Sequence, residues 1–295
     1  MESSEGLIAV EDGVHLYYLK LGSGARVVLM PNGLSFLEDF RRLAGRSTVI
    51  FYDVRNRGRS DTVTDQALLA RGIHQDVDDM DAVRRHFGLD QVDIIGHSYM
   101  GLVAALYLMK YPAHVRRLGQ IGPAQPDAAK QYPPHLTGAA DSALAEISAE
   151  LARMRQEPPS GGPEAMCRKF WSVMQRMFVV DPASAARVDW GRCHLPNERN
   201  FLRYWLGQLS PSIQSLKLAA EDFAKATAPV LIVHGTRDRN APYGGGRDWA
   251  ALLPNARLLT VPDAAHAPWI EAPELVFQSI ETFLDGAWPD AAEIV

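Results

Sequence analysis

The chain has 295 residues, 47% of them hydrophobic and 22% charged, and its formal net charge is −5. This length suits one large α/β domain with an insertion or two small domains, and the composition excludes a largely disordered chain. A nucleic-acid-binding protein would usually carry a basic patch, but the sequence has no run of lysine and arginine. No stretch approaches the apolar length of a membrane span, and the N-terminus lacks the apolar core of a signal peptide.

The sequence contains two cysteines, Cys167 and Cys193. They form neither a disulfide framework nor a CxxC metal spacing, so we interpret them as reduced thiols. Together with the missing signal peptide, this interpretation places the protein in the cytoplasm. Export with a leader that this sequence does not contain is the alternative.

Short apolar runs alternate with helical patterns in the first part of the chain. Apolar runs that end in turn residues predict four strands, at residues 27–30, 48–52, 92–95 and 118–121. Residues 76–87 carry apolar side chains at a spacing of three and four and are followed by Gly88, which predicts a helix. Strands separated by helices in this order are typical of a parallel sheet with right-handed crossovers.

The pattern changes between residues 123 and 226, where no run favours a strand. Amphipathic spacing predicts helices at residues 143–155, 167–178 and 200–209, with a proline- and glycine-rich break at 157–163. The alternation of strands and helices then returns, at residues 229–233, 246–253, 257–261 and 273–284. We therefore predict an α/β protein with a mostly parallel central sheet flanked by helices. Its core comprises residues 1–122 and 227–295, and residues 123–226 form an inserted helical cap.

Ser98 stands where the third predicted strand runs directly into an apolar helix at residues 102–109. A serine on such a tight turn projects its hydroxyl above the sheet, beside the N–H groups of a helix N-terminus. Acyl transfer needs this geometry, with an exposed nucleophile and donors close to the developing oxyanion. Gly96 supplies a small residue at the turn, but Met100 stands where the G-x-S-x-G pattern has its second glycine. The alternative is that Ser98 only caps the helix.

At this motif the chain resembles the α/β-hydrolase superfamily. It is most similar to the cap-bearing serine hydrolases, which include proline iminopeptidase-like enzymes, esterases and lactonases. The chain order in this fold is nucleophile, acid, histidine. Asp238 follows the strand at residues 229–233, and His266 lies on the loop after the next strand, with Ala265 where glycine is common. The resemblance therefore implies Ser98 as nucleophile, His266 as base and Asp238 as the acid that orients the base.

The chemistry requires these three side chains together. Serine must lose its proton during attack, and imidazole, with an ordinary pKa near 6.5, accepts that proton and returns it later. A carboxylate beside the imidazole fixes its tautomer and stabilises the imidazolium. His97 and His234 are weaker candidates for the base, and Asp248 and Asp263 are backup acids, because their positions fit the expected order less well.

The resemblance also implies an oxyanion hole and a structural loop. The backbone N–H groups of Tyr99 and Leu34 are the expected oxyanion donors, although Asn32 replaces the histidine that often precedes the second donor loop. Residues 53–60 resemble the D-x-R-G-x-G-x-S loop, with Asn56 in place of the first glycine; asparagine tolerates positive φ. We expect a structural role for this loop, and the alternative is that its arginines bind an anionic substrate.

Bulky apolar residues dominate the predicted cap and favour a small, uncharged acyl substrate. We expect substrate contacts from five residues, namely Met100, Trp171, Phe178, Tyr204 and Trp269. A proline iminopeptidase would need acidic cap residues to hold a free ammonium. No spacing singles out any of the available acids, which are Glu146, Glu150, Glu157, Glu164, Glu198 and Glu221.

These observations rank carboxylic-ester hydrolysis first, through an acyl-enzyme intermediate on Ser98. A proline iminopeptidase-like aminopeptidase or a lactonase is the alternative, and a hydrolase-fold receptor with little turnover is a second one. A serine nucleophile excludes the branches that form an alkyl ester on aspartate. The predicted triad needs no metal and no organic cofactor. The expected partner is a small acyl substrate, without nucleic acid or membrane, and the sequence leaves the oligomeric state open.

Overall fold

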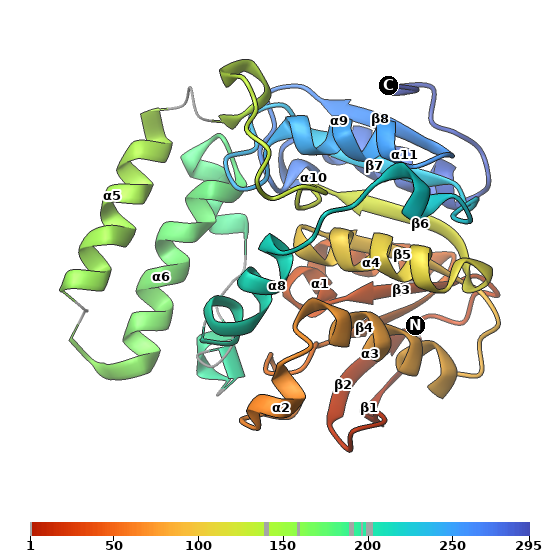
Figure 1. The fold of residues 1–295 in the computed structure, drawn as a ribbon, viewed down its shortest axis with the longest axis horizontal. Coiled ribbons are helices and arrows are strands. Elements are labelled where there is room, and N and C mark those ends of the chain that lie inside the picture. The colour runs from red at the N-terminus through yellow and green to blue at the C-terminus, as the bar shows by residue number, and fades with distance from the viewer. Residues whose placement is uncertain (1, 139–141, 158–159, 189–191, 196, 199–202) are drawn as a thin grey trace.

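The computed structural model describes residues 2–295 except 139–141, 158–159, 189–191, 196 and 199–202 (Figure 1). In the described residues the strands form one sheet in the order β1-β2-β4-β3-β5-β6-β7-β8-β9. The strands are β1 (Ser3–Ala9), β2 (His15–Leu21), β3 (Val27–Pro31), β4 (Thr48–Tyr52), β5 (Val92–His97), β6 (Val115–Ile121), β7 (Val230–Gly235), β8 (Ala256–Val261) and β9 (Ala292–Glu293).

The centre of the sheet is parallel from β4 to β8, which confirms the predicted fold class. Strands β4, β5 and β7 are buried throughout, and this burial on both faces explains why they read as continuous apolar runs. The antiparallel strands β1 and β2 at one edge and β9 at the other were not predicted. Most of β1 is exposed, so its sequence lacks the apolar signal of a core strand.

Helices cover both faces of the sheet. One face packs against α3 (Ile73–His86), α4 (Tyr99–Lys110) and α9 (Tyr243–Leu252). The other packs against the short turns η1 (Gly33–Phe36) and α1 (Leu37–Phe40) and against α10 (Pro268–Glu271) and α11 (Pro273–Leu284). The short segments η2 (Arg41–Gly45), α2 (Gln66–Leu69) and η3 (Pro112–His114) complete the connections. Helices on both faces are the arrangement that a parallel sheet requires.

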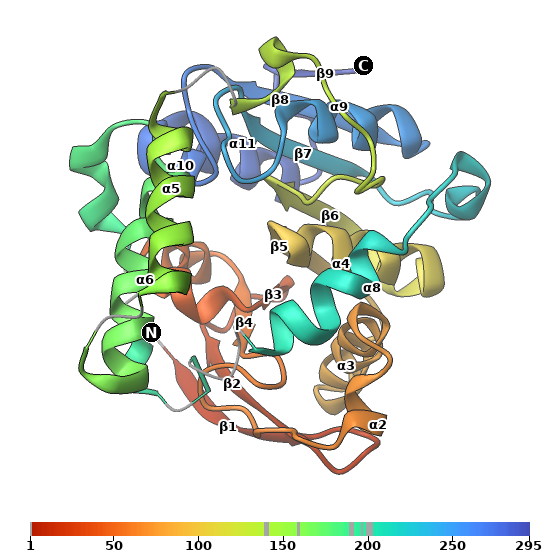
Figure 2. The same ribbon diagram turned by 60° about the vertical axis from the view of Figure 1, so that its left-hand side comes forward.

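Between β6 and β7 the described residues contain helices and turns but no strand. The longest are α5 (Ser142–Gln156) and α6 (Gly162–Phe178), which lie side by side next to the sheet (Figures 1 and 2) and share a small apolar cluster. The shorter ones are η4 (Pro134–Leu136), η6 (Pro182–Arg187), η7 (Arg192–His194), η8 (Trp205–Leu209), α8 (Ser210–Gln214) and η9 (Ala220–Phe223).

Two predictions in this segment differ from the structure at their boundaries. Helix α6 begins at Gly162, with Pro163 in its first turn, so it reaches into the predicted break; proline is well tolerated there. Part of that break, residues 158–159, lies outside the described residues. The same holds for residues 200–202 of the predicted helix at 200–209, whose later part forms the π-helical turn η8 and leads into α8.

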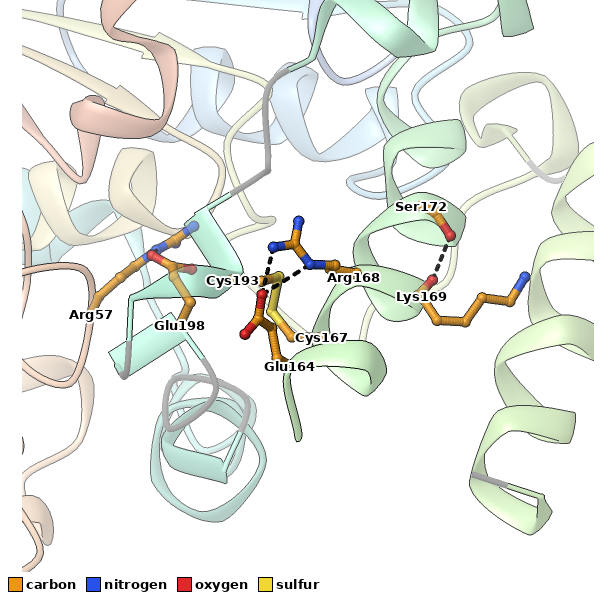
Figure 3. Close-up of a disulfide and its surroundings, with 8 residues drawn as sticks. All are labelled: Arg57, Glu164, Cys167, Arg168, Lys169, Ser172, Cys193 and Glu198. Carbon is orange, nitrogen blue, oxygen red and sulfur yellow. Dashed lines mark hydrogen bonds and ion pairs between the residues drawn. A yellow bond between two sulfur atoms is a disulfide. The ribbon is translucent and has the colours of Figure 1, made fainter. Parts of the chain in front are cut away.

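The prediction of two reduced thiols is wrong. Cys167 of α6 and Cys193 of η7 form a disulfide, with their Cα atoms 5.8 Å apart (Figure 3). The chain folds back so that η7 lies beside the first turns of α6, and sequence spacing alone does not reveal this contact. Disulfides are typical of oxidising compartments, so the cytoplasmic prediction loses the support that it took from free thiols. In the described part of the chain, no helix combines the length and apolar character of a membrane span.

Candidate active site

Ser98 lies between β5 and α4 and adopts φ 58° and ψ −128°, a conformation that L-residues with a side chain avoid. Backbone hydrogen bonds hold it there. Its N–H donates to Ile121 O (2.9 Å), and its carbonyl accepts from the N–H groups of Gly101 (2.9 Å) and Ala124 (3.1 Å). A Cβ atom on Gly96 would lie 2.4 Å from Met100 O, so this position requires glycine. The strand, turn and helix therefore form the sharp elbow expected from the motif.

Asp238 and His266 meet at the carboxyl edge of the sheet, in the loops after β7 and β8. Nδ1 of His266 donates to Oδ2 of Asp238 (2.7 Å), and both side chains are fully buried. Oδ1 of Asp238 accepts the N–H groups of Asn240 and Ala241, each at 2.8 Å. Burial alone would raise the pKa of Asp238, but His266 and His234 hold it well below its ordinary value. The carboxylate therefore keeps the proton of His266 on Nδ1 and leaves Nε2 as an acceptor.

Nε2 of His266 is buried and has no hydrogen-bond partner among the described residues. The ring packs against His97 and Phe178, with centroids 4.5 Å and 4.7 Å away. Because a carbonyl can only accept, His97 Nε2 donates to the backbone oxygen of His266 (2.9 Å). Burial and the neighbouring His266 hold the pKa of His97 well below its usual value, so this ring is neutral. His97 thus supports the loop that carries His266.

Gly122, directly after β6, lies against this pair of side chains and was missed by the sequence analysis. Its φ is 49°, and a Cβ atom there would lie 3.0 Å from Nδ1 of His266 and 3.2 Å from Oδ2 of Asp238. A glycine that follows a strand is the only signal in the sequence, and it is a weak one because glycine is common in turns.

A cavity of about 280 Å³ opens above Ser98. Its apolar wall includes one face of α6, where side chains at a spacing of three and four point inward. The lining residues are Pro31, Asn32, Phe36, Arg57, His97, Ser98, Tyr99, Met166, Cys167, Phe170, Trp171, Met174, Phe178, Glu198, Trp205 and Asn240.

The structure brings Trp171 and Phe178 to the cavity, as expected, but not the other three predicted contacts. Met100 and Tyr204 are buried in the core on the α3 and α4 side of the sheet. Trp269 packs on Phe36 and Phe40 on the opposite side and donates to Asp39. All five predicted contacts have bulky, mainly apolar side chains, so the sequence could not distinguish residues of a cavity wall from residues of the core.

The two expected oxyanion donors lie at the beginnings of helical turns. Tyr99 is the first residue of α4 and lines the cavity, and Leu34 is the second residue of η1. N–H groups in the first turn of a helix have no acceptor within that helix. Asn32, which precedes η1, has φ 57° and donates its N–H to Tyr52 O (2.7 Å). Leu34 is not among the described residues that line the cavity.

The loop at residues 53–60 contributes one arginine to the cavity. Asn56 has φ 59°, which confirms that it adopts the positive φ expected of the glycine that it replaces. Arg55 is fully buried and pairs with Asp79 and Asp12, so its role is structural. Arg57 lines the cavity, and its Nε lies 3.5 Å from Oε1 of Glu198. The sequence offered the arginines of this loop as an alternative substrate contact and Glu198 as one of six cap acids, without singling out Arg57 or Glu198.

The other expected alternatives lie elsewhere. Asp248 binds Tyr132 and Lys130 at the surface, and Asp263 is exposed. His234 is buried with Nε2 3.1 Å from Ala241 O, and it does not line the cavity. Within the described residues, no group of histidine, cysteine and acidic side chains is arranged to hold a metal ion.

Comparison with known proteins agrees with this architecture. A family model described as alpha/beta hydrolase fold matches residues 30–273. A pimeloyl-acyl-carrier-protein methyl ester esterase of Chromobacterium violaceum is 24% identical, over 87% of this chain and 93% of the relative. A proline iminopeptidase of Pestalotiopsis fici is 25% identical, over 87% and 88%. An esterase structure from Exiguobacterium antarcticum superposes with a TM-score of 0.73 at 19% identity and covers 96% of this chain and 100% of the esterase.

The chain therefore belongs to the α/β-hydrolase family, as its sequence predicts, and it is a hydrolase.

Proposed function

We propose that this protein hydrolyses carboxylic esters of small, uncharged acyl substrates, with Ser98 as nucleophile, His266 as base and Asp238 as the orienting acid. The observation that carries the proposal is the buried His266–Asp238 hydrogen bond, which leaves Nε2 of His266 unpartnered among the described residues, on a ring that packs against His97, the neighbour of Ser98 in the chain. Hydrogen bonds between nucleophile and base are often long before substrate binds. The similarity to an esterase from Chromobacterium violaceum supports the same reaction type.

The steps follow from the placement of these groups. Ser98 Oγ attacks the ester carbonyl carbon while Nε2 of His266 takes the hydroxyl proton. The tetrahedral oxyanion accepts hydrogen bonds from the N–H groups of Tyr99 and Leu34. The intermediate collapses, the C–O bond breaks, and His266 returns the proton to the leaving alcohol. Water then attacks the acyl-enzyme by the same route and releases the acid and Ser98.

Residues 123–226 act as the cap in this proposal. Their helix α6 supplies most of the apolar wall, and an apolar wall over the elbow excludes water and favours an uncharged acyl chain. The volume of about 280 Å³ suits a small substrate.

The charge in the cavity favours an ester over the amine-bearing substrate of an aminopeptidase. Of the cap acids considered from the sequence, Glu198 lines the cavity, and the guanidinium of Arg57 lies beside it. A substrate ammonium at Glu198 would lie close to that cation and be repelled. Glu150 and Glu164 form ion pairs with Lys169 and Arg168 at the surface.

A substrate panel on the purified protein tests the proposal. A fluorophosphonate probe should label the wild type and not Ser98→Ala, and p-nitrophenyl acetate should be turned over faster than prolyl-p-nitroanilide. Exhaustive dialysis against EDTA should leave turnover unchanged. Labelling that persists in Ser98→Ala would refute the nucleophile, and preference for the anilide would replace the esterase with an aminopeptidase. Stoichiometric labelling without turnover of either substrate would point to a receptor.

A further inference from the structure

One side of the cavity carries polar groups, and we call Asn32, Arg57 and Glu198 the polar corner. Glu198 is 4% exposed and Arg57 is 5% exposed, yet both line the cavity. Oε1 of Glu198 is buried and accepts no hydrogen bond from the described residues, although Nε of Arg57 lies 3.5 Å away. The same is true of Oδ1 of Asn32. Among the described residues, the polar corner therefore holds two buried acceptors without a hydrogen-bond donor.

A buried acceptor without a donor destabilises a folded protein, so such atoms call for an explanation by a bound molecule. A carboxylate oxygen can only accept, which means that the missing group carries an N–H or O–H. The ion pair with Arg57 makes the corner electrically balanced. The guanidinium of Arg57 would repel a ligand ammonium, and the carboxylate of Glu198 would repel a ligand carboxylate. A neutral donor therefore fits this corner better than either ion.

Neighbours of Glu198 in the chain are anchored to the core and to α6, so Glu198 belongs to a built site rather than to a loose rim. Arg192 makes two hydrogen bonds to the carboxylate of Asp53, at 3.0 Å and 2.9 Å. Asn197 bonds to Ser60 O and to Thr62. The disulfide between Cys193 and Cys167 ties the same segment to α6, and Figure 3 shows Glu198 and Arg57 facing one another near it.

We infer that the polar corner binds a neutral hydrogen-bond donor, a hydroxyl or an amide N–H, on the acyl substrate. This inference rests on the proposed esterase function and narrows it to hydroxylated or amide-bearing acyl esters. Glu198 Oε1 accepts the donor, Asn32 offers the second acceptor, and the apolar face of α6 contacts the rest of the chain. Glu198 acts here in substrate selection and not in the chemical step.

Matched esters test this assignment. We would measure kcat/KM for p-nitrophenyl esters of butyrate carrying a hydroxyl at C2 or C3, and for the corresponding methyl ethers, which lack the donor. For at least one position the wild type should prefer the hydroxyl over the ether by about tenfold, as expected of a hydrogen bond to a charged acceptor. Glu198→Gln, which keeps the volume but not the charge, should reduce this ratio severalfold, and Glu198→Ala should bring it close to one.

Glu221→Gln is the control, because Glu221 is an exposed acid in η9 of the same inserted segment. It should keep the wild-type ratio. Circular dichroism of both Glu198 variants verifies that they fold. A hydroxyl-to-ether ratio near one in the wild type at both positions would overturn the inference, as would a ratio that is unchanged in Glu198→Gln and Glu198→Ala.

Binding separates this inference from the proposed function. Isothermal titration of the same esters into Ser98→Ala measures their affinity for the polar corner in the absence of turnover. Tighter binding of a hydroxylated ester together with no hydrolysis by the wild type would refute the esterase and support the polar corner. Hydrolysis by the wild type without any difference in binding or in kcat/KM would support the esterase and refute the polar corner.

Discussion

Two buried histidines share one oxygen of Asp238. Nδ1 of His266 lies 2.7 Å from Oδ2, and Nε2 of His234 lies 3.3 Å from the same atom. They differ in where their second nitrogen points. Nδ1 of His234 faces the backbone of α9, where a Cβ on Gly246 would lie 2.3 Å away, whereas His266 packs against two residues that line the cavity, His97 and Phe178.

We therefore expect His266→Ala to lower kcat by about 10⁴-fold or more, and Asp238→Asn to lower it by up to about 10⁴-fold through loss of the correct tautomer. His97→Ala and His234→Ala should cost far less, because these rings support loops and take no proton. Steady-state kinetics on the four variants, with unfolding midpoints measured alongside, checks the ranking. If His266→Ala kept a near-wild-type kcat and His234→Ala lost it, the base would have to be reassigned from His266 to His234.

Gly122 offers a test of how tightly the His266–Asp238 pair is positioned. A methyl group at this position would crowd Nδ1 and Oδ2 at 3.0 Å and 3.2 Å and would also strain the positive φ. Gly122→Ala should lower kcat by about 10- to 100-fold, because small displacements of catalytic groups are costly. Gly119→Ala in β6 is the matched control, since its Cβ would find its nearest neighbour at an ordinary 3.5 Å. Equal kcat in the two variants would show that the pair tolerates displacement.

At the scale of the elements, the apolar pattern of the sequence predicted the strands that are buried in the sheet. Strands β4, β5 and β7 are apolar along their length because both faces are covered, and the glycine and serine of the elbow mark where β5 ends. The edge strands β1 and β9 were not predicted, because β1 is largely exposed and β9 is very short. The triad residues could be proposed because chain order in this fold is fixed. Gly122 was missed, and Arg57 and Glu198 could be chosen from their larger sets only when distant segments meet.

The disulfide joins two elements that the sequence left unconnected. It closes a loop between residues 26 positions apart, which corresponds to about 3.5 kcal/mol of stabilisation by chain entropy. The double variant Cys167→Ser/Cys193→Ser should lose about this much free energy of unfolding in urea. Thiol titration of the unreduced, denatured wild type should find no free thiol. Two titratable thiols there would restore the original interpretation of reduced cysteines.

At the scale of the whole molecule, a buried carboxyl group lies at the end of the sheet opposite Ser98. Ser98 lies at the carboxyl end of β5, and Asp93 lies near the opposite end of the same strand. Asp93 is fully buried, and Arg26, Arg116 and Arg117 approach it only to 3.6–3.9 Å. Burial outweighs these arginines and raises the pKa of Asp93 from 3.8 to about 6.

A carboxyl whose pKa is raised by folding stabilises the fold below its unfolded pKa, near 4, and loses that contribution as the pH rises through 6. Asp93→Asn should therefore be more stable than the wild type at pH 8, by about 3 kcal/mol, and similar to it at pH 4. Asp285→Asn is the contrasting variant, because a hydrogen bond from Arg26 lowers the pKa of Asp285, so its removal should destabilise the protein at pH 8. Denaturant unfolding at both pH values measures the effects. A loss of stability in Asp93→Asn at pH 8 would contradict this account.

The backbone of Ser98 implies a trade-off between activity and stability. In the described part of the chain, asparagine and aspartate, which tolerate positive φ, occupy the other non-glycine positions with positive φ, whereas Ser98 adopts φ 58°. Ser98→Gly should relieve this strain, so its free energy of unfolding should exceed that of Ser98→Ala by about 1 kcal/mol. It should also unfold at a higher denaturant concentration, although both variants lack the nucleophile. Equal midpoints for the two variants would argue against a strained elbow. A higher midpoint for the glycine variant would mean that the fold loses thermodynamic stability by keeping a serine at a position where glycine is less strained.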